Sequence, residues 1–236
     1  MLKIIKDQIK NILNLPSRWI CKYEFERQSF TRFNERCVEY SFVFKHLSQI
    51  YPRKVLDVGT GTSALPHLVH NCNILVTAID NIKDYWPLGM NNRHYYIIND
   101  DITNSLIDEK FDLITCISVL EHIEKSDIAI RNMFNLLNVY GYLIITFPYN
   151  ENNYVKNVYK LAGSSYNQNA PYICQSFSRN EINKWIQDNN GKIIDQEFWQ
   201  FWDGEYWTVG KQTIPPLKVN ATDKHQISCV VIQKRK

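Results

Sequence analysis

The residues best suited to chemistry in this 236-residue sequence are an aspartate and two glycines that lie close together. Residues 55–62 read VLDVGTGT, where an apolar, strand-like run carrying Asp57 leads into Gly59 and Gly61. Glycine lets the backbone turn sharply and approach a ligand without a Cβ atom in the way. Pro66 fits the first turn of a following helix, whose free amide groups favour an anionic group by about 0.3 to 1 kcal/mol. The stretch therefore predicts a ligand cradle.

Two more acidic segments follow the next strand-like runs. Asp80 ends the run 74–79, and the segment 99–102 follows the run 95–98. A carboxylate at a strand end accepts the hydroxyls of a ribose, and bonds to a charged acceptor contribute about 1.5 to 3 kcal/mol. In the segment 99–102, a side-chain acceptor beside an apolar residue suits the amino group and ring of adenine. Because open α/β sheets bind ligands at strand ends, these segments predict a nucleoside site.

The elements that must position these residues alternate between strand and helix. Strand-like runs separated by helical spacing predict parallel βαβ units wound right-handedly into one sheet. A capping-box pattern at Ser178 and Glu181 predicts a later helix, and two final runs with no helix between them predict an antiparallel pair at the sheet edge. The parallel strands are expected at 55–58, 74–79, 95–98, 111–117 and 142–147, the helices between them at 63–70 and 123–137, and the late pair at 192–202 and 226–233.

Two other segments are expected to surround the ligand. Residues 1–15 have amphipathic helical spacing, and residues 25–50 predict a second helix that stops at Tyr51. We therefore expect residues 1–50 to cover the active site and residues 51–236 to form the main domain. The first helix either packs on the fold or touches a membrane surface weakly with its basic side. The stretch 149–177 shows no clear period and predicts a substrate-side insertion.

Composition narrows the range of functions. The net charge is +3, but Lys and Arg are spread along the chain, without the basic stripe typical of nucleic-acid binding. The six cysteines lie far apart and lack zinc spacing, which predicts reduced thiols and a cytoplasmic protein. No apolar run approaches the roughly 18 to 20 residues of a membrane span. The composition favours a small molecule as partner and leaves the oligomeric state undetermined.

Five stretches of the chain together resemble the class I S-adenosylmethionine-dependent methyltransferases. They read VLDVGTGT, VTAIDN, NDDIT, FDLITCISVLEHI and LLNVYGYLIITFPY, and they span about residues 54 to 149. The likeness is strongest to the small-molecule branch that includes the quinone-biosynthesis methyltransferases. It implies a doubly wound α/β fold with a mostly parallel, seven-stranded sheet, helices on both faces and an antiparallel edge strand. It also implies S-adenosyl-L-methionine as cofactor and methyl transfer to a small molecule such as a sugar or a lipid-linked intermediate.

The resemblance also assigns residues to parts of the cofactor. The aspartate of the first strand and the glycine loop would hold the methionine part, Asp80 the ribose, and Asp101 with Ile102 the adenine. The full set of cofactor-binding residues that it implies is Asp57, Gly59, Thr60, Gly61, Asp80, Asn81, Asp101, Ile102, Cys116 and Ser118. The usual third glycine is replaced in the stretch 62–64. Some quinone-type relatives have a metal-binding glutamate where this chain has Ser118, so no metal is predicted.

The candidate catalytic residues are His122 and Glu121. His122 lies near the predicted methyl end and is either a general base or a structural hydrogen-bonding residue. Glu121 is either a catalytic group or a cap of the following helix.

Three other functions remain open at this stage. The glycines also fit a nicotinamide-dependent oxidoreductase, although Asp57 suits a sulfonium cofactor with a free amino group better than a pyrophosphate. The altered glycine loop fits a non-catalytic cofactor-binding module. Nucleic-acid methylation is disfavoured, because Cys116-Ile-Ser-Val stands where an Asn/Asp-Pro-Pro-Tyr/Phe motif is expected.

Overall fold

The structure is a computed structural model that describes residues 5, 6, 8, 9, 12, 14–27, 33–86, 95–165 and 168–236. The chain divides into one unit of residues 1–34 and a second unit of residues 35–236. In the first unit, helix α2 spans Leu15–Glu26. The amphipathic helix expected over 1–15 lies largely outside the described residues, although residues 5, 6, 8, 9 and 12 are helical.

The helix predicted over residues 25–50 is wrong in extent. Pro16 is the second residue of α2, a position where its missing N–H costs little, so the helix includes this proline and ends at Glu26. Helix α3, Arg36–Ile50, belongs to the second unit and begins separately. It ends at Tyr51, whose left-handed backbone conformation, with φ of 52°, closes the helix before Pro52.

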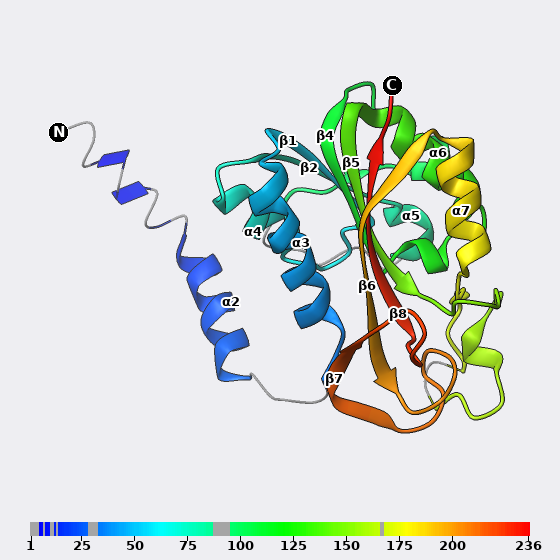
Figure 1. The fold of residues 1–236 in the computed structure, drawn as a ribbon. Helices are drawn as coiled ribbons and strands as arrows, with labels where there is room; N and C mark the ends of the chain where they lie inside the picture. The colour runs from blue at the N-terminus through cyan, green and yellow to red at the C-terminus, as the bar shows by residue number, and fades with distance from the viewer. Residues whose placement is uncertain are drawn as a thin grey trace. The chain divides into compact units, whose positions relative to one another are not determined.

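The second unit is built on one mixed sheet with the strand order β3-β2-β1-β4-β5-β8-β6-β7 (Figure 1). The pairs from β3 to β5 are parallel, and those that involve β8 or β7 are antiparallel. The predicted doubly wound, mostly parallel fold class is therefore confirmed. The strands are β1 (Lys54–Val58), β2 (Leu75–Asp80), β3 (Ile98–Asn99), β4 (Phe111–Ile117), β5 (Leu137–Pro148), β6 (Gly191–Trp202), β7 (Gln212–Val219) and β8 (Ile227–Lys234).

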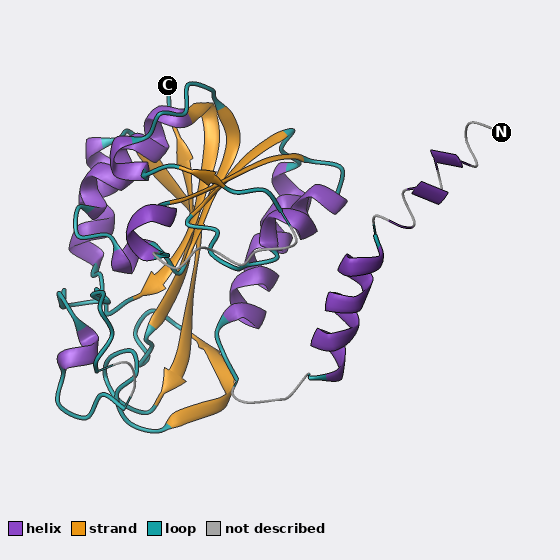
Figure 2. Cartoon of the chain, turned by 180° about the vertical axis from the view of Figure 1, so that it is seen from behind, coloured by secondary structure: helices purple, strands orange, loops and turns teal. Residues whose placement is uncertain are grey.

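Helices cover both faces of this sheet, with α3 and α4 on one side and α6 and α7 on the other (Figure 2). The main core lies between the sheet and the second pair, where Trp185 of α7 packs edge to face on Phe147 of β5 with ring centroids 5.8 Å apart. The capping box predicted at the start of α7 is present. The Ser178 side chain accepts from the backbone N–H of Glu181, and the Glu181 side chain accepts from the backbone N–H of Ser178. The helices are α4 (Leu65–Asn71), α5 (Ile82–Tyr85), α6 (Ser126–Leu136) and α7 (Arg179–Asp188), with 3₁₀ turns η1 (Ile102–Asn104), η2 (Leu120–His122) and η3 (Val158–Lys160).

The antiparallel part of the sheet differs from the prediction in two ways. The described part of the chain has eight strands in the sheet, not seven, because β7 adds an edge strand with the consecutive prolines Pro215 and Pro216. Prolines cannot donate to a ladder and are tolerated at a sheet edge, but they hid this strand from a pattern-based prediction. The late runs do pair as β6 and β8, but β8 lies between β5 and β6 rather than at the edge. Among the described helices, none has the length and apolar character needed to cross a bilayer.

Candidate active site

The glycine loop connects β1 to α4 and is fixed by its neighbours on both sides. Gly59 and Gly61 have φ of 71° and 56°, in the left-handed region that glycine adopts without strain. The Gly59 N–H donates to the Ile79 carbonyl at 2.9 Å, which ties the loop to β2. A Cβ atom on Gly59 would lie 2.3 Å from Cγ1 of Val119, in the segment that follows β4. The loop therefore joins the carboxyl ends of three neighbouring strands.

Asp57 lies buried at the end of β1, directly beneath this loop. Its two carboxylate oxygens accept from the hydroxyls of Thr60 at 2.7 Å and Thr115 at 2.6 Å. Burial raises the pKa of Asp57 to about 6, and the two hydroxyl donors oppose that rise by stabilising the charged form. The side chain is therefore held in one orientation and is charged at neutral pH.

Asp80 brings the end of β2 to the same loop. Its Oδ2 atom accepts from the Gly61 N–H at 2.7 Å. Burial raises its pKa, and hydrogen bonds from the Gly61 N–H and the Trp86 side chain counteract the rise. The structure thus brings Asp80 and the glycine loop together, as the nucleoside hypothesis requires. The next residue, Asn81, caps α5 by accepting from the Asp84 N–H at 3.4 Å.

Asp101 and Ile102 follow β3 and have more local roles. Asp101 caps η1 and accepts from the Thr103 N–H at 2.8 Å and the Thr103 hydroxyl at 2.9 Å. Ile102 is buried in the main core, so its side chain has little surface to offer to a ligand ring. Burial, with the nearby negative charges of Asp101 and Asp80, raises the pKa of Tyr85.

A charged cluster lies at the ends of β4 and β5, and we name it the acidic cluster: Arg36, Glu39, Ser118, Glu121 and His122. Glu39 of α3 is fully buried and accepts from the hydroxyl of Ser118 at 2.5 Å and that of Thr146 at 2.6 Å. Arg36 donates to Glu39 at 2.9 Å and to the Ile117 carbonyl at 3.3 Å. Cys116, just before this segment, is buried in the main core, where burial raises its pKa well above its ordinary value.

The sequence analysis missed Glu39. A signal did exist, because this acidic residue lies on a helix face with Val38, Phe42 and Val43, all of which are buried. A charged residue is almost never fully buried without a partner, so an acid on an apolar helix face indicates a specific polar contact. The partners could not be found in the sequence, since Ser118 and Thr146 are 79 and 107 positions away.

Glu121 and His122 lie side by side in η2. Glu121 is buried, and no described residue forms a hydrogen bond with its Oε2 atom. Burial, with the nearby negative charge of Glu39, raises the pKa of Glu121 to about 8, so this carboxyl group is largely protonated at neutral pH.

His122 is held as a neutral base. Its Nδ1 donates to the Ile173 carbonyl at 2.7 Å, since a carbonyl oxygen can only accept, and Nε2 therefore carries a lone pair. That atom lies 3.8 Å from Oε1 of Glu121. Burial lowers the pKa of His122, so the ring is neutral at pH 7 and Nε2 presents a lone pair that a bound group can share.

The comparison with protein families decides between the remaining hypotheses. Residues 30–196 match the family model described as a methyltransferase domain, a range that covers more than half of the chain. The chain belongs to this methyltransferase family. The family predicted from the five sequence stretches is thereby confirmed, and the nicotinamide alternative is disfavoured.

Curated relatives of this methyltransferase include two ubiquinone biosynthesis O-methyltransferases. The protein from Glaesserella parasuis serovar 5 (strain SH0165) is 32% identical over 108 residues, which are 41% of this chain and 46% of the relative. The protein from Coxiella burnetii (strain Dugway 5J108-111) is 25% identical over 154 residues, which are 61% of this chain and 65% of the relative. The methyltransferase thus spans about half to two thirds of the length of these relatives.

Solved structures share the fold of the methyltransferase at low identity. The 1,6-didemethyltoxoflavin-N1-methyltransferase of Burkholderia thailandensis, solved with 1,6-didemethyltoxoflavin and S-adenosylhomocysteine, has a TM-score of 0.57 at 15% identity and covers 96% of this chain and 90% of its own. The magnesium protoporphyrin IX methyltransferase of Synechocystis PCC 6803, solved with S-adenosylhomocysteine, has a TM-score of 0.53 at 14% identity and covers 97% and 99%. These likenesses support the fold assignment.

The segment 149–177 of the methyltransferase packs against the acidic cluster. The Gln175 N–H donates to the Glu121 carbonyl at 2.9 Å, and its side chain donates to the Ile123 carbonyl at 2.9 Å. The ring of Tyr172 meets that of His122 edge to face, with centroids 4.8 Å apart. The segment therefore borders the expected methyl end.

The late aromatic residues of the methyltransferase divide between core and partly exposed positions. Phe198 and Phe201 are buried, whereas Trp199 and Trp202 keep part of their surface exposed. Two of these four rings therefore belong to the core, and the buried pair does not follow a simple alternation because the register shifts between Gln200 and Trp202.

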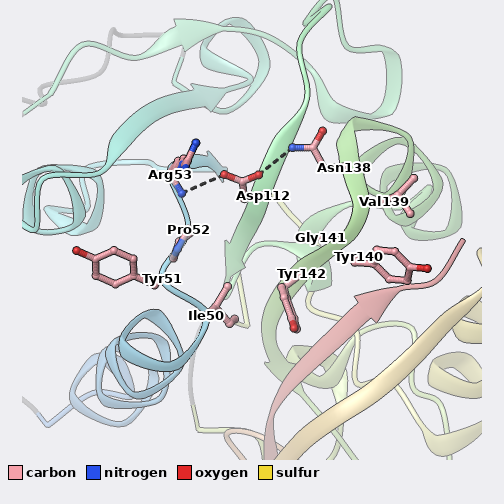
Figure 3. Close-up of a pocket in the computed structure, with 10 residues that line it drawn as sticks. All are labelled: Ile50, Tyr51, Pro52, Arg53, Asp112, Asn138, Val139, Tyr140, Gly141 and Tyr142. Atoms are coloured by element: carbon pink, nitrogen blue, oxygen red, sulfur yellow. Dashed lines mark hydrogen bonds between the residues drawn. The ribbon is translucent and has the colours of Figure 1, made fainter.

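A cavity of about 380 Å³ lies away from these residues, at the amino ends of β1 and β4 (Figure 3). Asp112 in its wall accepts from the Arg53 N–H at 3.0 Å and from the Asn138 side chain at 2.9 Å. No residue of the glycine loop or the acidic cluster lines this cavity, so it does not belong to the candidate active site.

Proposed function

We propose that this methyltransferase transfers a methyl group from S-adenosyl-L-methionine to a hydroxyl group of a small molecule. The observation that supports this methyl donor is the bond from the Gly61 N–H to the Asp80 carboxylate, because it holds against the glycine turn a group that can accept ribose hydroxyls. The observation that supports a hydroxyl group as methyl acceptor is the neutral His122 ring beside the ends of β4 and β5, which can serve as a base. The names of the curated relatives, ubiquinone biosynthesis O-methyltransferases, support an oxygen acceptor.

The residues at the site fit a positively charged donor. Asp57 accepts from Thr60 and Thr115, and Asp80 accepts from Gly61, Trp86 and Asn81. An ionised carboxylate can accept about four hydrogen bonds, so each keeps at least one lone pair. These remaining positions suit the amino group of the methionine part and the hydroxyls of the ribose. When bound, S-adenosyl-L-methionine supplies an activated methyl group carried on a positively charged sulfur.

The chain's own contribution is binding, orientation and proton removal. The glycine loop and Asp57 would hold the methionine part, Asp80 the ribose, and Asp101 the adenine. Positioning of two reactants in this way supplies about 7 to 11 kcal/mol of a reaction barrier. His122 would take the proton of the acceptor hydroxyl at Nε2 while Nδ1 keeps its bond to the Ile173 carbonyl.

We place the acceptor between α3 and the segment 149–177. Tyr40 of α3 bonds to Ser63 of the glycine loop at 2.7 Å, and Tyr172 of the segment contacts His122. Both elements thus reach the expected methyl end from different sides. The resemblance suggests a sugar or a lipid-linked intermediate as acceptor, whereas the names of the curated relatives suggest a quinone precursor.

Calorimetry with S-adenosylhomocysteine tests the donor assignment without knowledge of the acceptor. We expect Asp80→Ala to lower the affinity about tenfold or more, since loss of a hydrogen bond to a charged group costs about 1.5 to 3 kcal/mol. Asp188→Ala is the control, because Asp188 is an exposed acid at the end of α7 and is not among the predicted site residues. Unchanged affinity in Asp80→Ala would remove the ribose assignment, and absence of binding by the wild type would refute the donor.

A further inference from the structure

Glu121 stands out among the buried polar groups of the described residues. Four buried side-chain atoms there lack a hydrogen-bond partner, and Oε2 of Glu121 is the carboxylate oxygen among them. Burial of an ionised carboxylate without a partner is strongly unfavourable, so the group keeps its proton instead. A protonated carboxyl group at the expected methyl end can lose its proton when a positively charged ligand binds nearby.

The charged groups that surround Glu121 come from every element packed against it. From α3, Glu35 and Glu39 add negative charge, and Arg36 adds positive charge that is already paired with Glu39 at 2.9 Å. Other titratable groups near it are His122 in η2, Cys116 in β4 and Cys174 in the segment 149–177. His122 is neutral near pH 7 and both thiols are protonated, since burial raises their pKa. The surroundings therefore favour a cationic ligand over a neutral one.

We propose that Glu121 makes the site select the cationic methyl donor over its neutral product, by releasing a proton when a positively charged sulfur binds. This inference rests on the proposed function and adds a role for one residue to it. In the empty site Glu121 is neutral, and a cation nearby stabilises its ionised form. When the sulfur is uncharged, as in S-adenosylhomocysteine, that stabilisation is absent and Glu121 keeps its proton.

The released proton balances the one that the reaction produces. Methylation of a hydroxyl breaks an O–H bond and forms an O–C bond, while the S–C bond breaks and leaves its electron pair on sulfur. The proton of the hydroxyl goes to His122 Nε2 and from there to the ionised Glu121, whose Oε1 lies 3.8 Å from that nitrogen. Glu121 is then neutral beside a neutral product. One proton leaves to solvent in each turnover, and it does so when the donor binds.

Calorimetry in two buffers of different ionisation enthalpy measures the protons released on binding. At pH 7 a group with a pKa of about 8 is roughly nine-tenths protonated, so binding of S-adenosylmethionine should release up to about 0.9 proton. S-adenosylhomocysteine has the same amino and carboxyl groups and should release much less. Asp57, with a pKa of about 6, can supply about a tenth of a proton with either ligand. The difference between the two ligands therefore isolates the charge on sulfur.

Glu121→Gln supplies the decisive comparison, because glutamine mimics the protonated side chain in size and charge. We expect this variant to bind S-adenosylhomocysteine normally and to lose the extra proton release with S-adenosylmethionine. In the wild type, the preference for the donor should rise by up to about tenfold from pH 6 to pH 7, whereas in Glu121→Gln it should stay flat. The matched control is Glu124→Gln, which changes an exposed acid three residues away. A merely structural role of Glu121 would affect both ligands alike.

Three results would overturn the inference. Equal proton release with the two ligands in the wild type would show that no group senses the sulfur charge. Retention of the difference in Glu121→Gln would assign it to another residue. If the wild type binds neither ligand, the proposed function fails and this inference fails with it, whereas the first two results leave the proposed function in place.

Discussion

Asp80 at the end of β2 and Glu121 after β4 are both buried acids on the same edge of the sheet, yet their surroundings differ. On the side of β1 and β2, which we name the donor side, Asp57 and Asp80 receive hydrogen bonds from hydroxyl groups and backbone N–H groups. In the acidic cluster, Glu39 is bonded to three donors, whereas one oxygen of Glu121 has no partner among the described residues.

We propose that this difference separates ligand binding from proton transfer. Hydrogen bonds to the ionised form keep the donor-side acids charged and fixed, which suits recognition of hydroxyl and amino groups. Burial raises the pKa of Glu121 to about 8, so this carboxyl group can exchange a proton near neutral pH, which suits chemistry. Burial of Glu121 therefore lowers the stability of the folded chain when this carboxyl group is ionised.

The rigid donor side is tested most strongly by Gly59→Ala. The added Cβ atom would meet Val119 at 2.3 Å, and a φ of 71° is unfavourable for alanine. We expect the free energy of unfolding to fall by about 2 to 4 kcal/mol, as measured by urea denaturation. The control is Gly61→Ala, in which the new atom lies 3.4 Å from Trp86, so only backbone strain of about 1 kcal/mol remains. Equal losses in the two variants would show that Val119 does not confine the turn.

Glu121 of the acidic cluster, whose Oε2 atom has no partner among the described residues, should make the free energy of unfolding depend on pH. The pKa of Glu121 is about 8 in the folded chain against an ordinary 4.5, so the folded state holds a proton that the unfolded state has lost. The stability contributed by this group is therefore complete below about pH 4.5 and lost as the pH rises through 8. We expect the stability of Glu121→Gln relative to the wild type to increase by about 1 to 2 kcal/mol from pH 6.5 to pH 8.

The measurement is urea unfolding of both proteins at the two pH values. Any other group that titrates in this range does so in both proteins, so the difference isolates Glu121. A difference that stays constant with pH would mean that Glu121 is ionised in the folded chain at neutral pH. That result would contradict the contrast between the two sides of the site.

The donor side was predictable because its contacts are local in sequence. Asp57 and Thr60 are three residues apart, and the carboxyl end of the next strand follows about twenty residues later, a spacing that the βαβ unit imposes. Apolar runs likewise predicted β4 at 111–117 without error, because a central strand is buried on both faces.

The contacts of Glu39 in the acidic cluster and the antiparallel end of the sheet were not predictable for the opposite reason. Glu39 meets its partners across 79 and 107 positions, and nothing in their spacing indicates the contact. The insertion of β8 between β5 and β6 is decided by packing of whole strands, and the prolines of β7 hide its strand character. Long-range contacts can be identified only once the fold is known, whereas turns and single strands can be predicted from their own residues.

A smaller effect should come from Trp86, whose side chain donates to Asp80 and lies over Gly61. Trp86→Phe keeps the aromatic ring and removes the donor, so the pKa of Asp80 should rise and fewer molecules should present an ionised carboxylate. We expect the affinity for S-adenosylhomocysteine, measured by calorimetry, to fall about threefold at pH 7 and further at pH 6. The control is Trp202→Phe, because no described residue accepts a hydrogen bond from the Trp202 indole. If Trp86→Phe and Trp202→Phe bind the ligand equally well at both pH values, the Gly61 N–H alone suffices to fix Asp80, and the donor side owes its rigidity to the backbone.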